Sequence, residues 1–315
     1  MKSLRIAYMG TPHFAIGPLE VLTKSKHEVV VVVTAPDRKA GRGKKLQASP
    51  VKAFSETHGL PVLQPTNLKD TDFVAQLEAF QPDLIVVVAF RMLPEVVWAL
   101  PPFGTFNLHA SLLPQYRGAA PIHWAVINGE KETGVTTFFI DQQIDTGAVI
   151  AQKKTEIQAH ETTGSLSDRL ASLGSDLVVE TVELIASGQA TPVPQVFSDD
   201  LKPAPKLSRE NTRIDWSQNG EQIERWVRGL CPTPSAWTHL STNGQHLTCK
   251  IHEAVFEPKA HQEACGKISV ENKQIFVYVE GGILNVLNIQ LPNKKSLTAK
   301  ELLNGFVFSE NARFS

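Results

Sequence analysis

The stretch DLIVVVA, residues 83–89, places six apolar residues in a row between two helical patterns. A strand without polar alternation is buried on both faces, as in a parallel sheet that helices cover from both sides. Five further strand candidates precede or follow it: LRIAYMG (4–10), EVVVVVT (28–34), PVLQP (61–65), GTFNLHA (104–110) and GVTTFFI (134–140). Helical patterns lie between the strand candidates, over residues 14–24, 51–58, 71–80, 94–100 and 121–128. The first half therefore predicts an α/β fold with a doubly wound, mostly parallel, Rossmann-like sheet.

The second half of the chain has a different pattern, which follows a break. One amphipathic helix is predicted over residues 165–187, and Gly188 ends it. Residues 189–208 contain four prolines, which exclude a helix or a central strand, so residues 189–207 are predicted to form a linker. A helix over residues 219–230 comes next. The alternating runs that follow are LTCKIHEAVF (247–256), GKISV (266–270), QIFVYV (274–279) and ILNVLNIQL (283–291), with a last helix near 298–304.

Short alternating runs separated by turn residues predict a small antiparallel β-barrel, OB-like in type. The predicted organisation is therefore a first domain over residues 1–188, the linker, and a barrel domain over residues 208–315.

The composition excludes several classes of protein. Of 315 residues, 42% are hydrophobic and 20% are charged, and the net charge is −1. The longest apolar runs are far shorter than the roughly 20 residues that span a bilayer, so we expect no membrane anchor. No charged and apolar leader precedes the first strand, and three widely spaced cysteines fit a reducing compartment. We therefore expect a cytoplasmic protein, and the single glycine of the first turn, MGTPHFA, argues against a dinucleotide-binding loop.

Two polar side chains stand in the apolar strand GTFNLHA. Asn107 and His109 are two residues apart, so they project from the same face of the strand. Asp145 follows the next strand, and α/β sheets bind their ligands at the carboxyl ends of strands. A carboxylate orients an imidazole and an amide holds a carbonyl oxygen, so the three could stabilise an oxyanion and move one proton. A hydrogen-bonded core histidine and a turn-forming aspartate are the alternative interpretation.

The run FNLHASLLPQYRGAAPIHWAVINGEKETGVTTFFIDQQIDTGAVI, residues 106–150, resembles the formyltransferase family that uses 10-formyltetrahydrofolate. In that family an Asn-x-His pair, a Ser-Leu-Leu-Pro turn with Arg-Gly, and an Asp before Thr-Gly carry the reaction. The resemblance covers essentially the whole chain. It implies the formyltransferase fold, with Asn107, His109 and Asp145 as the catalytic triad. It also implies 10-formyltetrahydrofolate as the co-substrate and no metal, and we expect a monomer.

The resemblance further implies which residues surround the folate. It places the folate around AFRMLP (89–94), with the Ser-Leu-Leu-Pro turn and the loop at 140–145 closing on it. The implied folate-binding residues are Phe90, Arg91, Met92, Leu93, Ser111, Leu112, Leu113, Pro114, Ile140 and Asp141. Family members commonly have glycine where Arg91 and Gln143 stand, so these two positions depart from the family pattern.

A basic insertion indicates the acceptor of the formyl group. Residues 35–49 connect a strand to a helix, a connection that usually takes about 2–6 residues. The opening MGTPHFA, this insertion and the barrel resemble family members that formylate the α-amine of methionyl-initiator tRNA for translation initiation. Cations on this side of the sheet suit tRNA phosphates. The implied tRNA-binding residues are Arg38, Arg42, Lys44, Lys45, Lys206 and Arg209.

Alternatives remain open at this point. A sugar-nucleotide formyltransferase shares SLLPxYRG and a second domain, but it lacks the basic insertion. A member acting on glycinamide ribonucleotide is shorter and has a glycine- and serine-rich turn after its first strand. A non-catalytic RNA-binding or folate-sensing protein with this fold is the third alternative, and the intact triad argues against it. The insertion itself can also be a solvated run of charge.

Overall fold

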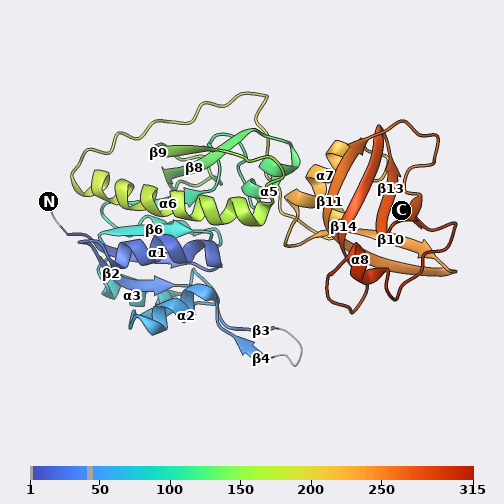
Figure 1. Ribbon diagram of the computed structural model, residues 1–315. Helices are drawn as coiled ribbons and strands as arrows, with labels where there is room; N and C mark the ends of the chain where they lie inside the picture. The colour runs from blue at the N-terminus through green and yellow to red at the C-terminus, as the bar shows by residue number, and fades with distance from the viewer. Residues whose placement is uncertain (1–2, 41–44) are drawn as a thin grey trace. The chain divides into compact units, whose positions relative to one another are not determined.

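The computed structural model describes residues 3–40 and 45–315, and the chain separates into two compact units, each assembled from three segments (Figure 1). The first unit contains the described residues up to Gly118, together with Glu132–Thr155 and Ser167–Pro203. The second unit contains Ala119–Lys131, Glu156–Leu166 and Ala204–Ser315. Because the two units are interleaved along the chain, the linear domain boundaries drawn from the sequence stay a prediction.

The first unit is built on a seven-stranded sheet with the order β5-β2-β1-β6-β7-β8-β9. Its strands are β1 (Arg5–Gly10), β2 (Glu28–Val33), β5 (Val62–Leu63), β6 (Leu84–Val88), β7 (Thr105–His109), β8 (Glu132–Phe139) and β9 (Val149–Glu156). The strands from β5 to β7 pair in parallel, whereas β8 pairs antiparallel with β7. The mostly parallel sheet is thus confirmed. β9 was not predicted, because this terminal strand reads as polar in the sequence.

Helices cover both faces of this sheet, which confirms the doubly wound arrangement. They are α1 (Ile16–Thr23), α2 (Pro50–Thr57), α3 (Thr71–Ala79), α4 (Glu95–Trp98) and α6 (Thr163–Ala186), with the 3-10 turn η1 (His13–Ala15) before α1. On one face, Met9 and Val87 share a core cluster with Phe73 of α3. On the other face α6 packs on β7, since a Cβ on Gly174 would lie 2.7 Å from Leu108, and α1 runs beside α6 (Figure 1).

Local chemistry sets the ends of these helices. The Ser49 hydroxyl accepts a hydrogen bond from the Lys52 amide and so caps the start of α2. The Asp70 carboxylate caps α3 in the same way. After α6, Gly188 has a φ of +70°, the left-handed conformation with which glycine terminates helices. The predicted helix starts and stops are therefore confirmed to within a few residues.

The second unit is built on an antiparallel sheet with the order β12-β13-β14-β11-β10-β16, and β15 pairs with β14. Its strands are β10 (Ala236–Thr242), β11 (Gln245–Pro258), β12 (Ile268–Glu271), β13 (Gln274–Val279), β14 (Gly282–Gln290), β15 (Leu297–Thr298) and β16 (Arg313–Phe314). A bridge between Lys267 and Arg313 joins the two ends of this order, so the sheet curls into a partly closed barrel. The predicted small barrel is confirmed, although β10, β15 and β16 were not predicted.

The barrel core is completed by the last strand. Phe314 of β16 is 1% exposed and stacks on Trp216, with 5.2 Å between the ring centroids. The Phe314 amide donates to the Gly266 carbonyl at 2.8 Å, and the Trp216 indole donates to the Thr238 hydroxyl at 2.8 Å. The Phe314 amide and the Trp216 indole N–H therefore both have hydrogen-bond partners. The aromatic pair can thus bury its apolar surface without leaving a donor unpaired.

The helices of the second unit include one that the sequence had grouped with the first. They are α5 (Pro121–Ile127), α7 (Gly220–Gly229) and α8 (Ala299–Leu302), with the 3-10 turn η2 (Glu210–Thr212). Trp124 of α5 meets Trp226 of α7 edge to face at 6.1 Å, and a Cβ on Gly229 would lie 2.5 Å from Ile127. By its contacts α5 thus belongs to the second unit. Among the described residues, no helix is long and apolar enough to cross a bilayer.

The three cysteines are free thiols, and their burial differs. Cys249 is fully buried in the barrel core, and this burial raises its pKa to about 12. Because the thiolate is the nucleophile, a raised pKa leaves almost none of the reactive form at pH 8.

We expect Cys249 to resist iodoacetamide at pH 8 in the native protein and to react once urea unfolds the barrel. Peptide mass spectrometry measures the modified fraction, and the partly exposed Cys265 is the internal reference. Equal labelling of Cys249 before and after unfolding would contradict the buried assignment.

Candidate active site

Asn107 and His109 lie at the carboxyl end of β7, as the spacing predicts. Asn107 pairs in register with Val87 on one side and with Phe138 of β8 on the other. Asn107 is half-buried, whereas His109 is only 6% exposed. The strand alternation points both side chains to one face of the sheet.

The two ring nitrogens of His109 have different partners. Nε2 lies 2.8 Å from the carbonyl oxygen of Tyr116, and a carbonyl only accepts, so Nε2 carries a hydrogen. Nδ1 lies 3.7 Å from Oδ2 of Asp145, which is too long for a hydrogen bond and short enough for an ion pair. A proton taken up at Nδ1 would therefore sit next to a carboxylate.

Asp145 is held in the loop between β8 and β9. Its carboxylate accepts a hydrogen bond from the Gly118 amide at 2.9 Å, and its φ of +56° is in the left-handed region. Two residues later the backbone passes so close to Phe139 that a Cβ on Gly147 would lie 1.7 Å from the Phe139 carbonyl oxygen. Only glycine fits there, so the path of the chain past Asp145 is fixed by close packing.

The carboxamide of Asn107 has an unused end. Oδ1 of Asn107 is buried and has no hydrogen-bond partner among the described residues. Rotation of the carboxamide about its last side-chain bond exchanges the positions of its oxygen and nitrogen. The group can therefore present either an acceptor or a donor to a ligand. A buried oxygen without a hydrogen-bond partner costs free energy, so Oδ1 of Asn107 marks a position where a donor from a ligand would fit.

The loop after β7 is held by hydrogen bonds within itself and to β8. The Ser111 hydroxyl donates to the Gln115 carbonyl at 2.6 Å, and the Leu113 amide donates to Thr136 at 3.1 Å. Ser111 and Leu113 are buried, while Leu112 and Pro114 are half-buried. Of the four residues implied for folate here, Ser111 and Leu113 are thus engaged in holding the turn.

Two other implied folate segments open on one cavity. Arg91, Met92 and Leu93 line a cavity of about 470 Å³ together with Gln142 from the loop after β8. Met92 is 75% exposed, whereas Leu93 is buried. Phe90 lies beneath the Arg91 guanidinium, 5.6 Å from its carbon to the ring centroid.

Arg91, a departure from the family pattern, is tied to the protein. Its guanidinium donates to the carbonyl oxygens of Thr66, at 2.8 Å, and Pro65. Burial lowers the pKa of Arg91, and the nearby charge of Arg38 lowers it further. Arg91 therefore shapes the wall of this cavity and brings positive charge to it.

The loop after β8 is ordered by its own acid. The Asp141 carboxylate accepts hydrogen bonds from the Gln143 amide at 3.0 Å and from the Thr146 hydroxyl at 2.8 Å. Ile140 packs against the core cluster on the face of Met9 and Val87. Ile140 thus anchors the start of the segment, and Asp141 binds Gln143 before Asp145 and Thr146 after it.

The basic insertion contains a hairpin, β3 (Arg38–Ala40) with β4 (Lys45–Gln47), so its described part is more regular than the sequence suggested. Arg38 is exposed. Two predicted tRNA-binding residues, Arg42 and Lys44, lie outside the described residues, and only the backbone of Lys45 is described. At the base of the insertion the Lys52 ammonium pairs with the carboxylate of Asp37 at 2.7 Å. Lys52 thus neutralises Asp37, the one acidic residue between positions 35 and 49.

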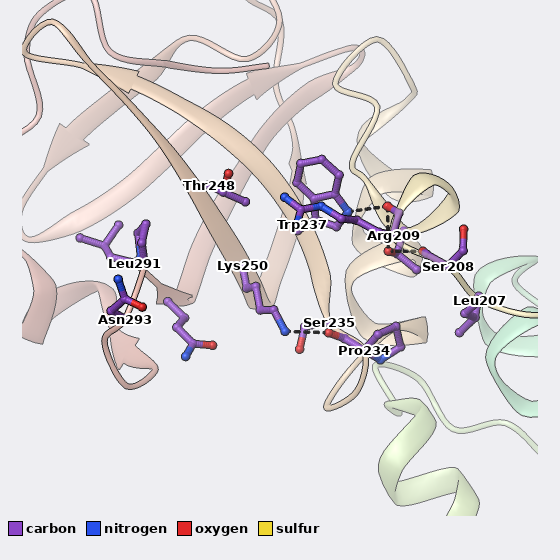
Figure 2. A pocket seen from close by; sticks show the side chains of 13 residues that line it. Leu207, Ser208, Arg209, Pro234, Ser235, Trp237, Thr248, Lys250, Leu291 and Asn293 are labelled. Carbon is purple, nitrogen blue, oxygen red and sulfur yellow. Dashed lines mark hydrogen bonds between the residues drawn. The ribbon is translucent and has the colours of Figure 1, made fainter. Parts of the chain in front are cut away.

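One of the cations predicted for the second unit, Arg209, lines a pocket that also contains Trp237. Figure 2 shows Arg209, Trp237 and Lys250 around a cavity of about 480 Å³. The Trp237 indole donates to the Arg209 carbonyl at 2.7 Å, and the Arg209 guanidinium lies 5.0 Å from the ring centroid. Arg213 adds a second cation at 5.7 Å, and Lys206 is exposed. Trp237 and Lys250 were missed in the sequence, because neither follows a motif and β10 was not predicted.

Comparisons with known proteins identify the family. A family model described as formyl transferase matches residues 4–182, and one described as formyl transferase, C-terminal domain, matches residues 206–307. The methionyl-tRNA formyltransferase of Flavobacterium johnsoniae is 49% identical over 313 residues, which cover 99% of each chain. That of Bacteroides fragilis is 49% identical over 314 residues, covering 98% of this chain and 97% of the relative.

The fold itself recurs in solved structures. WlaRD, a sugar 3N-formyl transferase crystallised in the presence of dTDP and 5-N-formyl-THF, superposes with a TM-score of 0.65. The superposition covers 94% of this chain and 100% of WlaRD, at 17% identity, so this likeness concerns the fold alone. The two family models cover most of the chain, and the relatives match it from end to end. The chain belongs to the formyl transferase family.

Proposed function

We propose that this chain transfers the formyl group of 10-formyltetrahydrofolate to the α-amine of methionyl-initiator tRNA, as a cytoplasmic monomer. The observation that carries the proposal is the grouping of three side chains: the carboxamide of Asn107, whose oxygen has no partner among the described residues, the imidazole of His109 on the same face of β7, and the carboxylate of Asp145, whose Oδ2 lies 3.7 Å from Nδ1 of His109. The acceptor is supported by the two relatives described above, both of which are methionyl-tRNA formyltransferases.

The folate, when bound, supplies an activated formyl carbon and a nitrogen that leaves. Asn107 donates through its amide nitrogen to the formyl oxygen while negative charge grows there, and this donor needs no reorganisation because the strand holds it. His109 accepts at Nδ1 the proton that the attacking α-amine loses. Asp145 stabilises the imidazolium, and His109 then returns the proton to the departing folate nitrogen. A carbon–nitrogen bond to the α-amine thus replaces the one to the folate nitrogen, and one proton moves from the amine to that nitrogen.

The residues around this site fit a folate. The cavity beside Met92 and Arg91 has apolar walls, two cations, Lys69 and Arg91, and one acid, Glu95, so apolar surface and a net positive charge are available to an aromatic ring system that ends in carboxylates. The buried oxygen of Asn107, which has no partner among the described residues, can accept a hydrogen bond from the folate or the acceptor. The proposed folate contacts come from Phe90 to Leu93 and from the loop at 140–145. The Ser111–Pro114 turn is proposed to close on the folate from the other side.

The tRNA contacts are proposed on chemical grounds. Arg38 of the insertion and Lys206 and Arg209 of the second unit are exposed cations, and cations of this kind contact phosphates. Arg42, Lys44 and Lys45 of the insertion complete the set that the sequence implied. Trp237, next to Arg209, adds an aromatic surface on which an unpaired base can stack.

The acceptor is tested directly with the purified protein and 10-formyltetrahydrofolate. The acceptors compared are methionyl-initiator tRNA, free methionine and a 4-amino sugar nucleotide, and mass spectrometry identifies the formylated product. We expect formylmethionyl-tRNA and no other product. Formylation of the sugar nucleotide alone would replace the proposed acceptor, and no product from any acceptor would remove the proposed activity.

A salt series tests the cations of the second unit. Each phosphate contact steepens the dependence of log affinity on log salt by about 0.7–0.9. We therefore expect Lys206→Ala and Arg209→Ala each to lower the slope for tRNA binding by about this amount. Filter binding across salt concentrations measures the slope.

The matched control is Lys300→Ala, which removes an exposed cation of α8 in the same unit. Its slope should equal that of the unchanged protein. If all three variants shift the slope alike, binding reflects net charge and the two proposed contacts are wrong.

A further inference from the structure

The proline-rich segment after α6 is attached to the site at several points. Val193 and Val149 exchange two backbone hydrogen bonds, both 2.8 Å long, at the start of β9. We call residues 193–202 the strap. In the strap, which lies entirely within the described part of the chain, only Gln195 and Leu201 are not exposed, and Gln195 is polar. A linker that served only as a spacer would have no reason to direct one side chain inward.

Gln195 joins the two loops that carry the site. Its amide nitrogen donates to the carbonyl oxygen of Asp145 at 3.0 Å and to that of Gly147 at 2.8 Å. Its amide oxygen accepts from Nε of Arg117 at 3.1 Å. One carboxamide thus ties the backbone on both sides of Thr146 to the residue before Gly118, whose amide binds the Asp145 carboxylate.

The strap also supports His109 through the chain after β7. The Tyr116 amide donates to the Lys202 carbonyl at 2.7 Å, and the Lys202 amide donates to the Gln115 side chain at 2.8 Å. Tyr116 supplies in turn the carbonyl that accepts from Nε2 of His109. The strap therefore reaches both members of the pair, Asp145 through Gln195 and His109 through Tyr116.

Arg117 is fixed on its other side as well. Its guanidinium lies 4.1 Å from the ring centroid of Phe197, an otherwise exposed residue of the strap. Burial lowers the pKa of Arg117, while the charges of Asp145 and Asp141 act in the opposite direction. The Arg117 guanidinium thus stacks on Phe197, lies near the carboxylates of the loop after β8, and donates to Gln195.

We infer that Gln195 is a positioning residue for formyl transfer, which holds Asp145 at the distance from His109 that the reaction needs. The left-handed backbone of Asp145, with a φ of +56°, is disfavoured for residues other than glycine and persists only where neighbouring contacts hold it. Gln195 supplies two of these contacts. The inference rests on the proposed function, because it assigns Gln195 a part in that reaction.

The test is Gln195→Met, which keeps the length of the side chain and removes its donors and its acceptor. Misplacement of a reacting group by about 1 Å costs on the order of 10²-fold in rate, so we expect kcat to fall by about 10- to 100-fold. KM for tRNA should stay unchanged, because Gln195 is not among the proposed tRNA contacts. Val196→Ala is the control, since Val196 is its neighbour in the strap and is 79% exposed.

Nuclear magnetic resonance of the His109 imidazole separates this inference from the proposed function, because it requires no turnover. In folate-free protein we expect the imidazole resonances of His109 to move in Gln195→Met and to stay in place in Val196→Ala. Unchanged resonances together with an unchanged kcat would overturn the inference. If the unchanged protein formylates no acceptor, the proposed function fails, and the resonances alone decide whether Gln195 positions the pair.

Discussion

Replacement of Asn107 by alanine is expected to lower the rate constant for formyl transfer by about 10²- to 10³-fold, because loss of one oxyanion donor typically has that effect. The side chain is half-buried at the end of β7, its oxygen has no partner among the described residues, and it shares a face with His109. Because this oxygen has no hydrogen-bond partner among the described residues, removal of the side chain should leave the fold intact. Single-turnover kinetics with charged initiator tRNA measure the rate constant.

Asn107→Asp is the matched variant, because it keeps the shape of the side chain and exchanges a donor for negative charge. It should be at least as slow as Asn107→Ala, whereas a space-filling role would leave it nearly as fast as the unchanged protein. His109→Ala, compared in the same assay, should fall into the same range. Formylation by folded Asn107→Ala at nearly the original rate would show that the oxyanion is stabilised elsewhere.

Replacement of Phe314 by alanine is expected to lower the free energy of unfolding of the second unit by about 3–5 kcal/mol, as for other buried phenylalanines. The ring is 1% exposed and is stacked on Trp216 at 5.2 Å, so its loss leaves a cavity at the joint between β16 and β10. Urea unfolding followed by tryptophan fluorescence measures the change, with Trp216 as a reporter next to the cavity.

Arg313→Ala is the control for this prediction, since Arg313 is the neighbouring residue of β16 and its side chain is exposed. It removes no buried area, so we expect a change within about 0.5 kcal/mol. If Phe314→Ala and Arg313→Ala unfold at the same urea concentration, the last strand is not part of the barrel core.

Among the strands that the sequence predicted, the clearest are three that are almost completely buried. β1, β2 and β6 are buried on both faces, and such strands must be apolar throughout, which a single sequence displays directly. β9 alternates polar residues at the end of the sheet and β16 has only two residues, so neither carries such a signal. β16 pairs with β10, about 70 residues earlier, and a partner so distant is not encoded in local periodicity.

The site shows the same division between local and distant information. Asn107 and His109 could be predicted because two residues in one strand share a face whatever the rest of the fold does. The approach of Asp145 to His109 depends on the antiparallel pairing of β8 with β7, which an apolar run does not specify. Gln195 was missed altogether, because it acts on backbone carbonyls 50 residues away from a segment without periodicity.

The place of α5 in the second unit has a consequence for the newly made chain. Trp124 leaves the ribosome about 100 residues before Trp226, the aromatic ring of α7 that it packs against. At about 5–20 residues per second, this interval lasts roughly 5–20 s. During this interval α5 has been synthesised, whereas α7, against which it packs, has not. The nascent polypeptide therefore exposes an apolar surface that chaperones can bind, and it loses this surface only when α7 emerges.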